Sequence, residues 1–271
     1  MAAGPWRILW ACLMLAAPAA AHADGVVRLH AAGSLRPALT EMAQAFVAAR
    51  GMRVMPVFGA SGLLRERLAG GEPGDVFASA DMGNPQALAR DGRAGPVVTF
   101  ARNRMCALAR PGLDIGPAAV LDTMLAPGTR LGTSTPGSDP SGDYAQQVFR
   151  RAEGVRPGAG AALDAKALRL TGGPASPAPP PGRNAYAWHI ADGRADVFLA
   201  YCTAAREAAA EATSLHAVEL PPDLAVGAEY GLTALRGADP RTALPFVLFI
   251  LSPDGQAILA RHGFEAPLAP R

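Results

Sequence analysis

The regular alternation of strand-like and helix-like segments constrains the fold of this chain most strongly. Residues 26–30 form a short apolar strand pattern, and the apolar residues that follow, from Leu35 to Phe46, recur at helical spacing. A second strand-like run, residues 53–58, leads into another helical pattern. Such alternation continues along the chain and is typical of α/β layering. We therefore predict an α/β fold with a mainly parallel sheet.

Two short turns place a serine where a strand gives way to a helix. Ser34 lies in the turn of residues 31–35, and Ser61 lies in the turn of residues 59–63, one strand and one helix further along. We predict that both serines are helix N-caps. Serine caps many helices that bind nothing, but a helix N-terminus also offers unpaired N–H groups and a positive dipole end, which suit an anion. Because the two turns match, we interpret them as two halves of an oxyanion cradle.

The first residues are typical of a secretory signal peptide. Arg7 supplies the positive charge, residues 8–17 the apolar stretch, and residues 21–23 a small-x-small cleavage site. We predict cleavage after Ala23 and a periplasmic location. Lipidation at Cys12 is disfavoured, because a lipidated cysteine should follow the apolar stretch. Removal of Arg7 from the 25 basic residues leaves 24 against 23 acidic ones, so nucleic acid is not an expected partner.

Two cysteines remain in the mature chain, Cys106 and Cys202. An oxidising compartment would permit a disulfide between them. Both lie in apolar strand-like runs, however, so we favour two separately buried thiols. The spacing of the cysteines and histidines matches no metal-binding motif, and we expect neither a resident metal nor a cofactor.

Six segments, in their order and spacing, carry a resemblance to a known family. They are the turn at Ser34, the turn at Ser61, and residues 74–81, 139–144, 196–201 and 252–264. In these segments the chain resembles the periplasmic molybdate-binding proteins that feed ABC transporters. The resemblance extends over nearly all of the mature chain.

The resemblance implies the fold of a type II periplasmic binding protein, with two α/β lobes joined by two crossing strands. After a signal peptide of residues 1–23, lobe one would comprise residues 24–107 and 224–271, and lobe two residues 108–223. The extended segments near Cys106 and residues 218–230 would be the hinges. Closure of the two lobes over a ligand would then be a hinge motion.

The same resemblance implies which residues contact the ligand. They are Ser34 and Ser61 from lobe one, and from lobe two the backbone at Ser141, the turn at Arg183 and Asn184, and the hydroxyl of Tyr201. Molybdate is a fully deprotonated dianion at neutral pH and needs only hydrogen-bond donors; tungstate remains an open alternative. The side chain of Arg183 either adds donors or points to solvent. Asp139, which would repel a dianion, is expected to cap the following helix.

Other classes of protein compete with this interpretation. A secreted serine hydrolase is disfavoured, because neither serine lies in a Gly-x-Ser-x-Gly elbow. A ferric-ion carrier could use Tyr144, Tyr186, Tyr201 and Tyr230, but the chain lacks the adjacent tyrosines usual in such carriers. The effector domain of a transcription factor is disfavoured by the export signal. We therefore expect a non-enzymatic monomer without catalytic residues, which captures molybdate, tungstate or another oxyanion for an ABC transporter permease.

Overall fold

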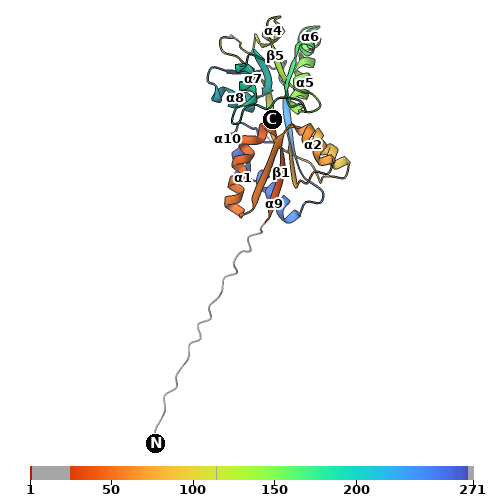
Figure 1. Cartoon of the computed structure of the whole chain (residues 1–271), viewed down its shortest axis with the longest axis vertical. Helices are drawn as coiled ribbons and strands as arrows, with labels where there is room; N and C mark the ends of the chain where they lie inside the picture. Colours follow the sequence, from red (N-terminus) through yellow and green to blue (C-terminus); the bar gives the residue numbers. More distant parts are fainter. Residues whose placement is uncertain (2–24, 114, 268–271) are drawn as a thin grey trace.

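The computed structural model describes residues 1, 25–113 and 115–267. Residues 2–23 of the expected signal peptide, with Cys12 and the cleavage site, lie outside the described residues. Figure 1 shows two lobes, one carrying β1, α1, α2 and α9, and the other carrying β5 and helices α4 to α8. No single helix among the described residues is long and apolar enough to cross a bilayer; α9 and α10 together meet that test only as a pair bent by 60°.

The elements follow the alternation expected from the sequence. The strands are β1 (Val26–Ala32), β2 (Arg53–Gly59), β3 (Val76–Ser79), β4 (Val98–Ala109), β5 (Leu131–Ser134), β6 (Leu168–Thr171), β7 (Val197–Tyr201), β8 (His216–Glu219) and β9 (Gly227–Ala234). The helices are α1 (Arg36–Arg50), α2 (Ser61–Ala69), α3 (Gly83–Arg90), α4 (Val120–Leu125), α5 (Pro140–Val155), α6 (Ala159–Lys166), α7 (Ala185–Ala191), α8 (Cys202–Glu211), α9 (Pro240–Leu251) and α10 (Pro253–Arg261), with a 3-10 turn η1 (Gly33–Leu35).

Three helices begin with the same local chemistry, a capping side chain followed by proline. Asp139 accepts a hydrogen bond from the amide of Ser141 at the start of α5, which confirms the expected cap. Asp239 and Ser252 cap α9 and α10 in the same way. The proline that follows each cap fits the first helical turn, where its missing N–H costs nothing.

Strand β4 belongs to the sheets of both lobes. Its first part, to Arg104, pairs with β9, and its second part, from Met105, pairs with β7 on one edge and β8 on the other. The path of hydrogen-bonded strands runs β2-β1-β3-β9-β4-β7-β5-β6. The chain thus crosses between the lobes along β4 and returns into β9. The exact boundaries after residues 107 and 223 stay a prediction.

The sheet is mixed, so the expectation of a mainly parallel sheet is wrong. Pairings of β1 with β2 and β3, and of β5 with β6 and β7, are parallel. All pairings of β4, and the pairing of β3 with β9, are antiparallel. The strands that cross between lobes run back along the sheet, and the strand-helix alternation of the sequence does not reveal their direction.

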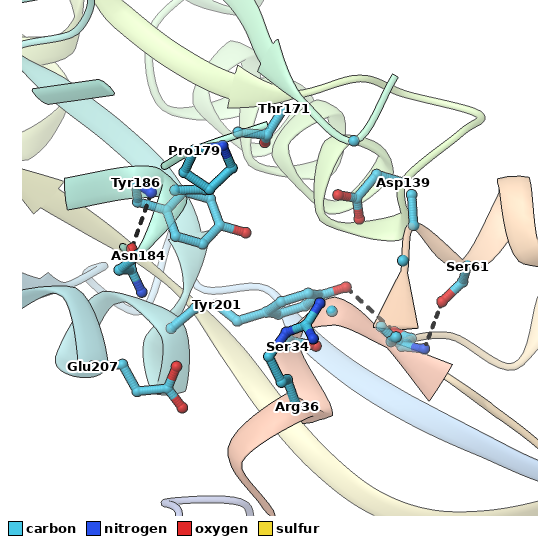
Figure 2. Close-up of a pocket in the computed structure, with 18 of the residues that line it drawn as sticks. Ser34, Arg36, Ser61, Asp139, Thr171, Pro179, Asn184, Tyr186, Tyr201 and Glu207 are labelled. Carbon is cyan, nitrogen blue, oxygen red and sulfur yellow. Dashed lines mark hydrogen bonds between the residues drawn. The ribbon is translucent and has the colours of Figure 1, made fainter. Parts of the chain in front are cut away.

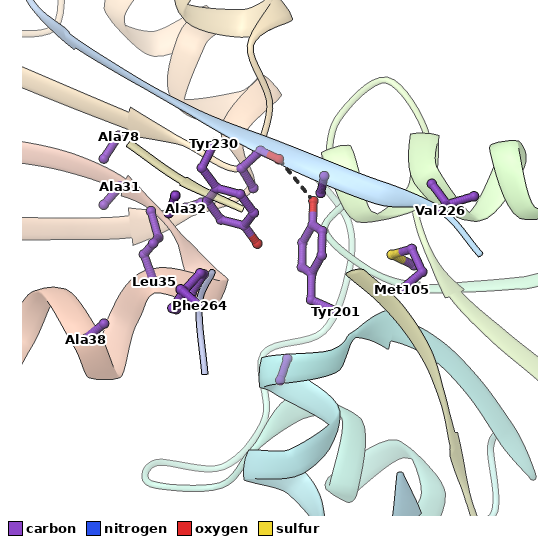
Figure 3. Close-up of a cluster of buried hydrophobic side chains, with 14 of the residues drawn as sticks. Ala31, Ala32, Leu35, Ala38, Ala78, Met105, Tyr201, Val226, Tyr230 and Phe264 are labelled. Carbon is purple, nitrogen blue, oxygen red and sulfur yellow. Dashed lines mark hydrogen bonds between the residues drawn. The ribbon is translucent and has the colours of Figure 1, made fainter. Parts of the chain in front are cut away.

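A buried aromatic group lies beneath the junction of the lobes. The rings of Tyr201 in β7 and Tyr230 in β9 have centroids 5.5 Å apart, and Phe264 meets Tyr230 edge-on at 5.4 Å. Figure 3 shows these rings beside Leu35 and the small residues of β1. Both tyrosines are almost fully buried. This packing anchors both lobes to one apolar cluster and fixes the strand ends that face the gap between them.

Cys106 and Cys202 form a disulfide, so the expectation of two separate thiols is wrong. Cys106 lies in β4 and Cys202 is the first residue of α8. Both residues are buried. Buried free thiols and a buried disulfide both lie among apolar residues, so the apolar sequence around each cysteine does not distinguish them. The bond joins a crossing strand to a helix of lobe two.

Reduction of this disulfide should lower the free energy of unfolding by about 2–5 kcal/mol, because the two cysteines are 96 residues apart and close a long loop. Urea unfolding of the mature protein with and without reductant measures the effect. The double variant Cys106→Ala/Cys202→Ala should not respond to reductant. Alkylation of two thiols in native, unreduced protein would contradict the bond.

Candidate functional site

A cavity of about 330 Å³ lies between the lobes. It is bounded by the turn after β1, the start of α2, the end of β7, the helix α8 and the loop that precedes α7. Figure 2 shows most of the residues that line it. Five of the six residues expected to bind the ligand are among them: Ser34, Ser61, Arg183, Asn184 and Tyr201. Ser141 is not among the lining residues.

Ser34 lies within the 3-10 turn η1 and its side chain caps no helix, so the N-cap prediction is wrong for it. Its Oγ is instead 3.0 Å from the Tyr230 hydroxyl, which also accepts a hydrogen bond from Asn103 Nδ2 at 3.3 Å. With Asn103 as donor to Tyr230, the tyrosine proton can be donated to Ser34 Oγ. The Ser34 proton is then left to point into the cavity.

Ser61 is the first residue of α2, with Ala60 at the N-cap position, so the N-cap prediction is wrong here too. Its buried Oγ accepts a hydrogen bond from the amide of Ala80 at 3.1 Å. A hydroxyl that accepts in this way keeps its own proton as a donor. Ser61 therefore presents a fixed donor at the positive end of a helix.

The lobes touch at two points beside these serines. The Gly62 amide donates to the carbonyl of Ser138 in lobe two at 2.9 Å. The Tyr201 hydroxyl donates to the carbonyl of Ala80 at 3.3 Å. The structure is therefore a closed form, and the Tyr201 proton is turned toward Ala80.

The start of α5 supplies a carboxylate to the cavity. Asp139 lines it, and Figure 2 shows the carboxylate turned inward. Burial raises the pKa of Asp139 to about 6, although the hydrogen bond from the backbone N–H of Ser141 acts to lower it. That amide is therefore occupied by Asp139, while the buried Ser141 Oγ has no partner within the described residues. A ligand contact through the Ser141 backbone would have to share this amide.

Arg183 and Asn184 come from the end of the proline-rich loop. Arg183 Nε donates to the Glu211 carboxylate at 2.7 Å, and the backbone N–H of Asn184 donates to the same carboxylate at 2.6 Å. Asn184 Oδ1 also caps α7, accepting from the amides of Tyr186 and Ala187. Both residues line the cavity, but the Arg183 guanidinium is half-exposed and already paired.

The structure adds lining residues that the sequence analysis did not identify. Arg36, in the first turn of α1, stacks on Phe58 with its guanidinium carbon 4.6 Å from the ring centroid. A basic residue two positions after the serine of a strand-helix turn is a signal that could have revealed it. Thr171 and Glu207 also line the cavity, and nothing local in the sequence marks them. Tyr186, considered above only as a ligand of a ferric ion, lines it as well.

Burial disfavours the charged forms of several groups that line the cavity or lie behind its walls. It raises the pKa of Glu207 to about 7 and that of Tyr144 to about 12. It also raises the pKa of Tyr186, Tyr201 and Tyr230 above the ordinary value for tyrosine. The tyrosines therefore carry neutral hydroxyl groups, while Asp139 and Glu207 each change between the protonated and the ionised form near neutral pH.

A family model described as bacterial extracellular solute-binding protein matches residues 27–265. An uncharacterised protein of Pasteurella multocida, PM1146, is 34% identical over 209 residues, covering 77% of this chain and 86% of its own length. The molybdate-binding protein ModA of Mycobacterium bovis is 29% identical over 244 residues, covering 88% of this chain and 83% of its own.

Solved structures show the same fold. The periplasmic molybdate-binding protein of Azotobacter vinelandii superposes with a TM-score of 0.71 at 20% identity, covering 89% of this chain and all of its own. The sulfate-binding protein SubI of Mycobacterium tuberculosis superposes with a TM-score of 0.72 at 20% identity, covering 90% of this chain and 87% of its own.

The raised pKa of Asp139 predicts that Asp139→Asn stabilises the protein at high pH. The folded state binds this proton more tightly than the unfolded state, so the ionised carboxylate costs stability above about pH 6 and nothing below about pH 4. Asparagine is an equally good N-cap. We expect a gain of about 1–2 kcal/mol at pH 8 that vanishes at pH 4.

Urea unfolding at the two pH values measures this gain. Asp239→Asn is the matched control, because Asp239 also caps a helix but its pKa is lowered by Arg241. That control should show no gain at pH 8. Equal stability of Asp139→Asn and the unsubstituted protein at both pH values would show that the charge costs nothing.

Proposed function

Because the chain belongs to the bacterial extracellular solute-binding proteins, we propose that it captures a tetrahedral oxyanion between its lobes and delivers it to an ABC transporter permease. Molybdate is the first candidate and tungstate the second. The motifs around Ser34 and Ser61 and the ModA relative support this choice. The expected signal peptide supports action in the periplasm, and a monomer would suffice for it.

The observation that carries the proposal is the pair of serine donors that face one cavity. Ser61 keeps its proton free because its Oγ accepts from Ala80, and Ser34 keeps its proton free because Tyr230 can supply the other bond. The first turn of α2 adds the positive end of a helix. Donors fixed in this way stabilise an anion without rearrangement on binding.

The alternatives gain less support from the geometry. A hydrolase would need a histidine beside a serine, whereas Ser34 Oγ is hydrogen-bonded to the Tyr230 hydroxyl and Ser61 Oγ accepts from the Ala80 amide. A ferric carrier would need phenolates, whereas burial holds the pKa of the four tyrosines above the ordinary value. An oxyanion that carries a proton, such as hydrogen phosphate, is favoured by one observation: the Asp139 carboxylate can accept a hydrogen bond from its P–OH group.

Ser61→Ala should weaken oxyanion binding roughly tenfold to hundredfold, because one buried charge-assisted hydrogen bond is lost. Calorimetry of the mature protein with molybdate measures the change. Ser214→Ala is the control, since Ser214 is exposed and does not line the cavity. Unchanged affinity in Ser61→Ala would remove this serine from the site.

A thermal-shift panel identifies the anion. Molybdate, tungstate, sulfate, phosphate and ferric citrate are compared, since a ligand that binds only the native state raises the melting temperature. Stabilisation by molybdate or tungstate above sulfate supports the first choice. Stabilisation by ferric citrate alone would instead favour an iron carrier.

Gly62→Ala should prevent full closure over the ligand. A Cβ at this position would lie 2.6 Å from the carbonyl oxygens of both Gly137 and Ser138, so the lobes would have to separate. We expect affinity for the oxyanion to fall roughly tenfold to hundredfold, on the scale of steric overpacking. Gly154→Ala is the matched control, because a Cβ there meets open space. Equal calorimetric affinity for all three proteins would contradict the closure contact.

A further inference from the structure

The cavity continues well beyond the two serines. Figure 2 shows Ser61 at one end and Glu207 of α8 at the other, with Tyr201 and Arg36 between them. The serine end holds the hydroxyl donors and, beside Ser61, the carboxylate of Asp139. The far end offers a second acceptor, the carboxylate of Glu207, and a tetrahedral ion held by the serines has no use for an acceptor there.

Glu207 is an unused acceptor within this cavity. No hydrogen bond or ion pair joins its carboxylate to another of the described residues, unlike Glu211 one turn later, which holds Arg183 and Asn184. Burial raises the pKa of Glu207 to about 7, although the charge interaction with His262 acts to lower it. A partly buried carboxyl group without a partner is costly, and a ligand that donates a hydrogen bond would remove that cost.

The size of the cavity is not a result of separated lobes. Gly62 and Ser138 already touch through their main chains, and the Tyr201 hydroxyl reaches Ala80. In this closed form about 330 Å³ remains, which falls in the range of pockets that enclose small organic ligands, about 300–1,000 Å³. A bare oxyanion at the serines would leave the Glu207 end empty.

We propose that the cleft also takes an oxyanion carrying a small organic substituent, namely a phosphate monoester whose substituent ends in an ammonium or hydroxyl group. The phosphate lies at Ser34 and Ser61, and the donor of the substituent reaches Glu207. This rests on the proposed function, because the serines must hold an oxyanion first. Arg36, stacked on Phe58 between the two ends, balances the charge of the phosphate.

Two probes of equal chain length test the proposal, phosphoethanolamine and ethyl phosphate, which differ only in the ammonium group. Calorimetry with the mature protein should show that phosphoethanolamine binds roughly tenfold more tightly or better, since one charge-assisted bond is added. In Glu207→Gln this preference should disappear. Glu219→Gln is the control, because Glu219 is an exposed carboxylate in β8 outside the cavity; this variant should keep the preference.

The outcomes separate this inference from the proposed function. Equal binding of the two probes, no binding of either, or a preference that survives Glu207→Gln overturns the inference. If molybdate still binds in a Ser61-dependent way, only the inference has failed. If Ser61→Ala changes the binding of no oxyanion, the proposed function fails as well. A melting curve for Glu207→Gln excludes misfolding as the cause of a lost preference.

Discussion

The cleft depends on the hydrogen bonds made by the buried side-chain amide of Asn103. Asn103 lies in β4 where the strand passes between lobes, and its Nδ2 donates to Thr203 of α8 at 2.9 Å and to Tyr230 of β9. Its Oδ1 accepts from the Arg104 amide. Every polar atom of this side chain is thus used, as burial demands. Through Tyr230 the amide also sets the direction of the Ser34 hydroxyl.

The cleft is therefore asymmetric in its hydrogen-bonding character. Lobe one contributes hydroxyl protons and a helix N-terminus, whereas lobe two contributes the carboxyl groups of Asp139 and Glu207. Such a site discriminates among anions by where a proton or a substituent lies on them, because an acceptor that faces a second acceptor is repelled. Likeness to molybdate-binding and sulfate-binding proteins describes the scaffold, while the two carboxyl groups of Asp139 and Glu207 supply the hydrogen-bond acceptors of the cleft in this chain.

Local chemistry was readable from the sequence, and long-range pairing was not. The strand-serine-helix turns and the Asp139 cap depend on neighbours within a few residues, so they were found, although Ser34 and Ser61 turned out to bond across the fold instead of capping. The Cys106–Cys202 bond joins residues 96 positions apart, and the antiparallel pairing of β9 with β4 joins residues that are further apart still. Glu207 lies on an ordinary helix, and only packing brings it to the cavity.

The contact between Gly62 and Ser138 joins main-chain atoms only. The hydrogen bond does not use the side chain of Ser138, so a substitution at position 138 leaves both atoms of this contact in place. Position 62 does not tolerate such a substitution, because any side chain there would collide with the opposing carbonyls. We therefore expect related sequences to keep glycine at position 62, at the start of α2, and to vary more at position 138, in the turn that faces it.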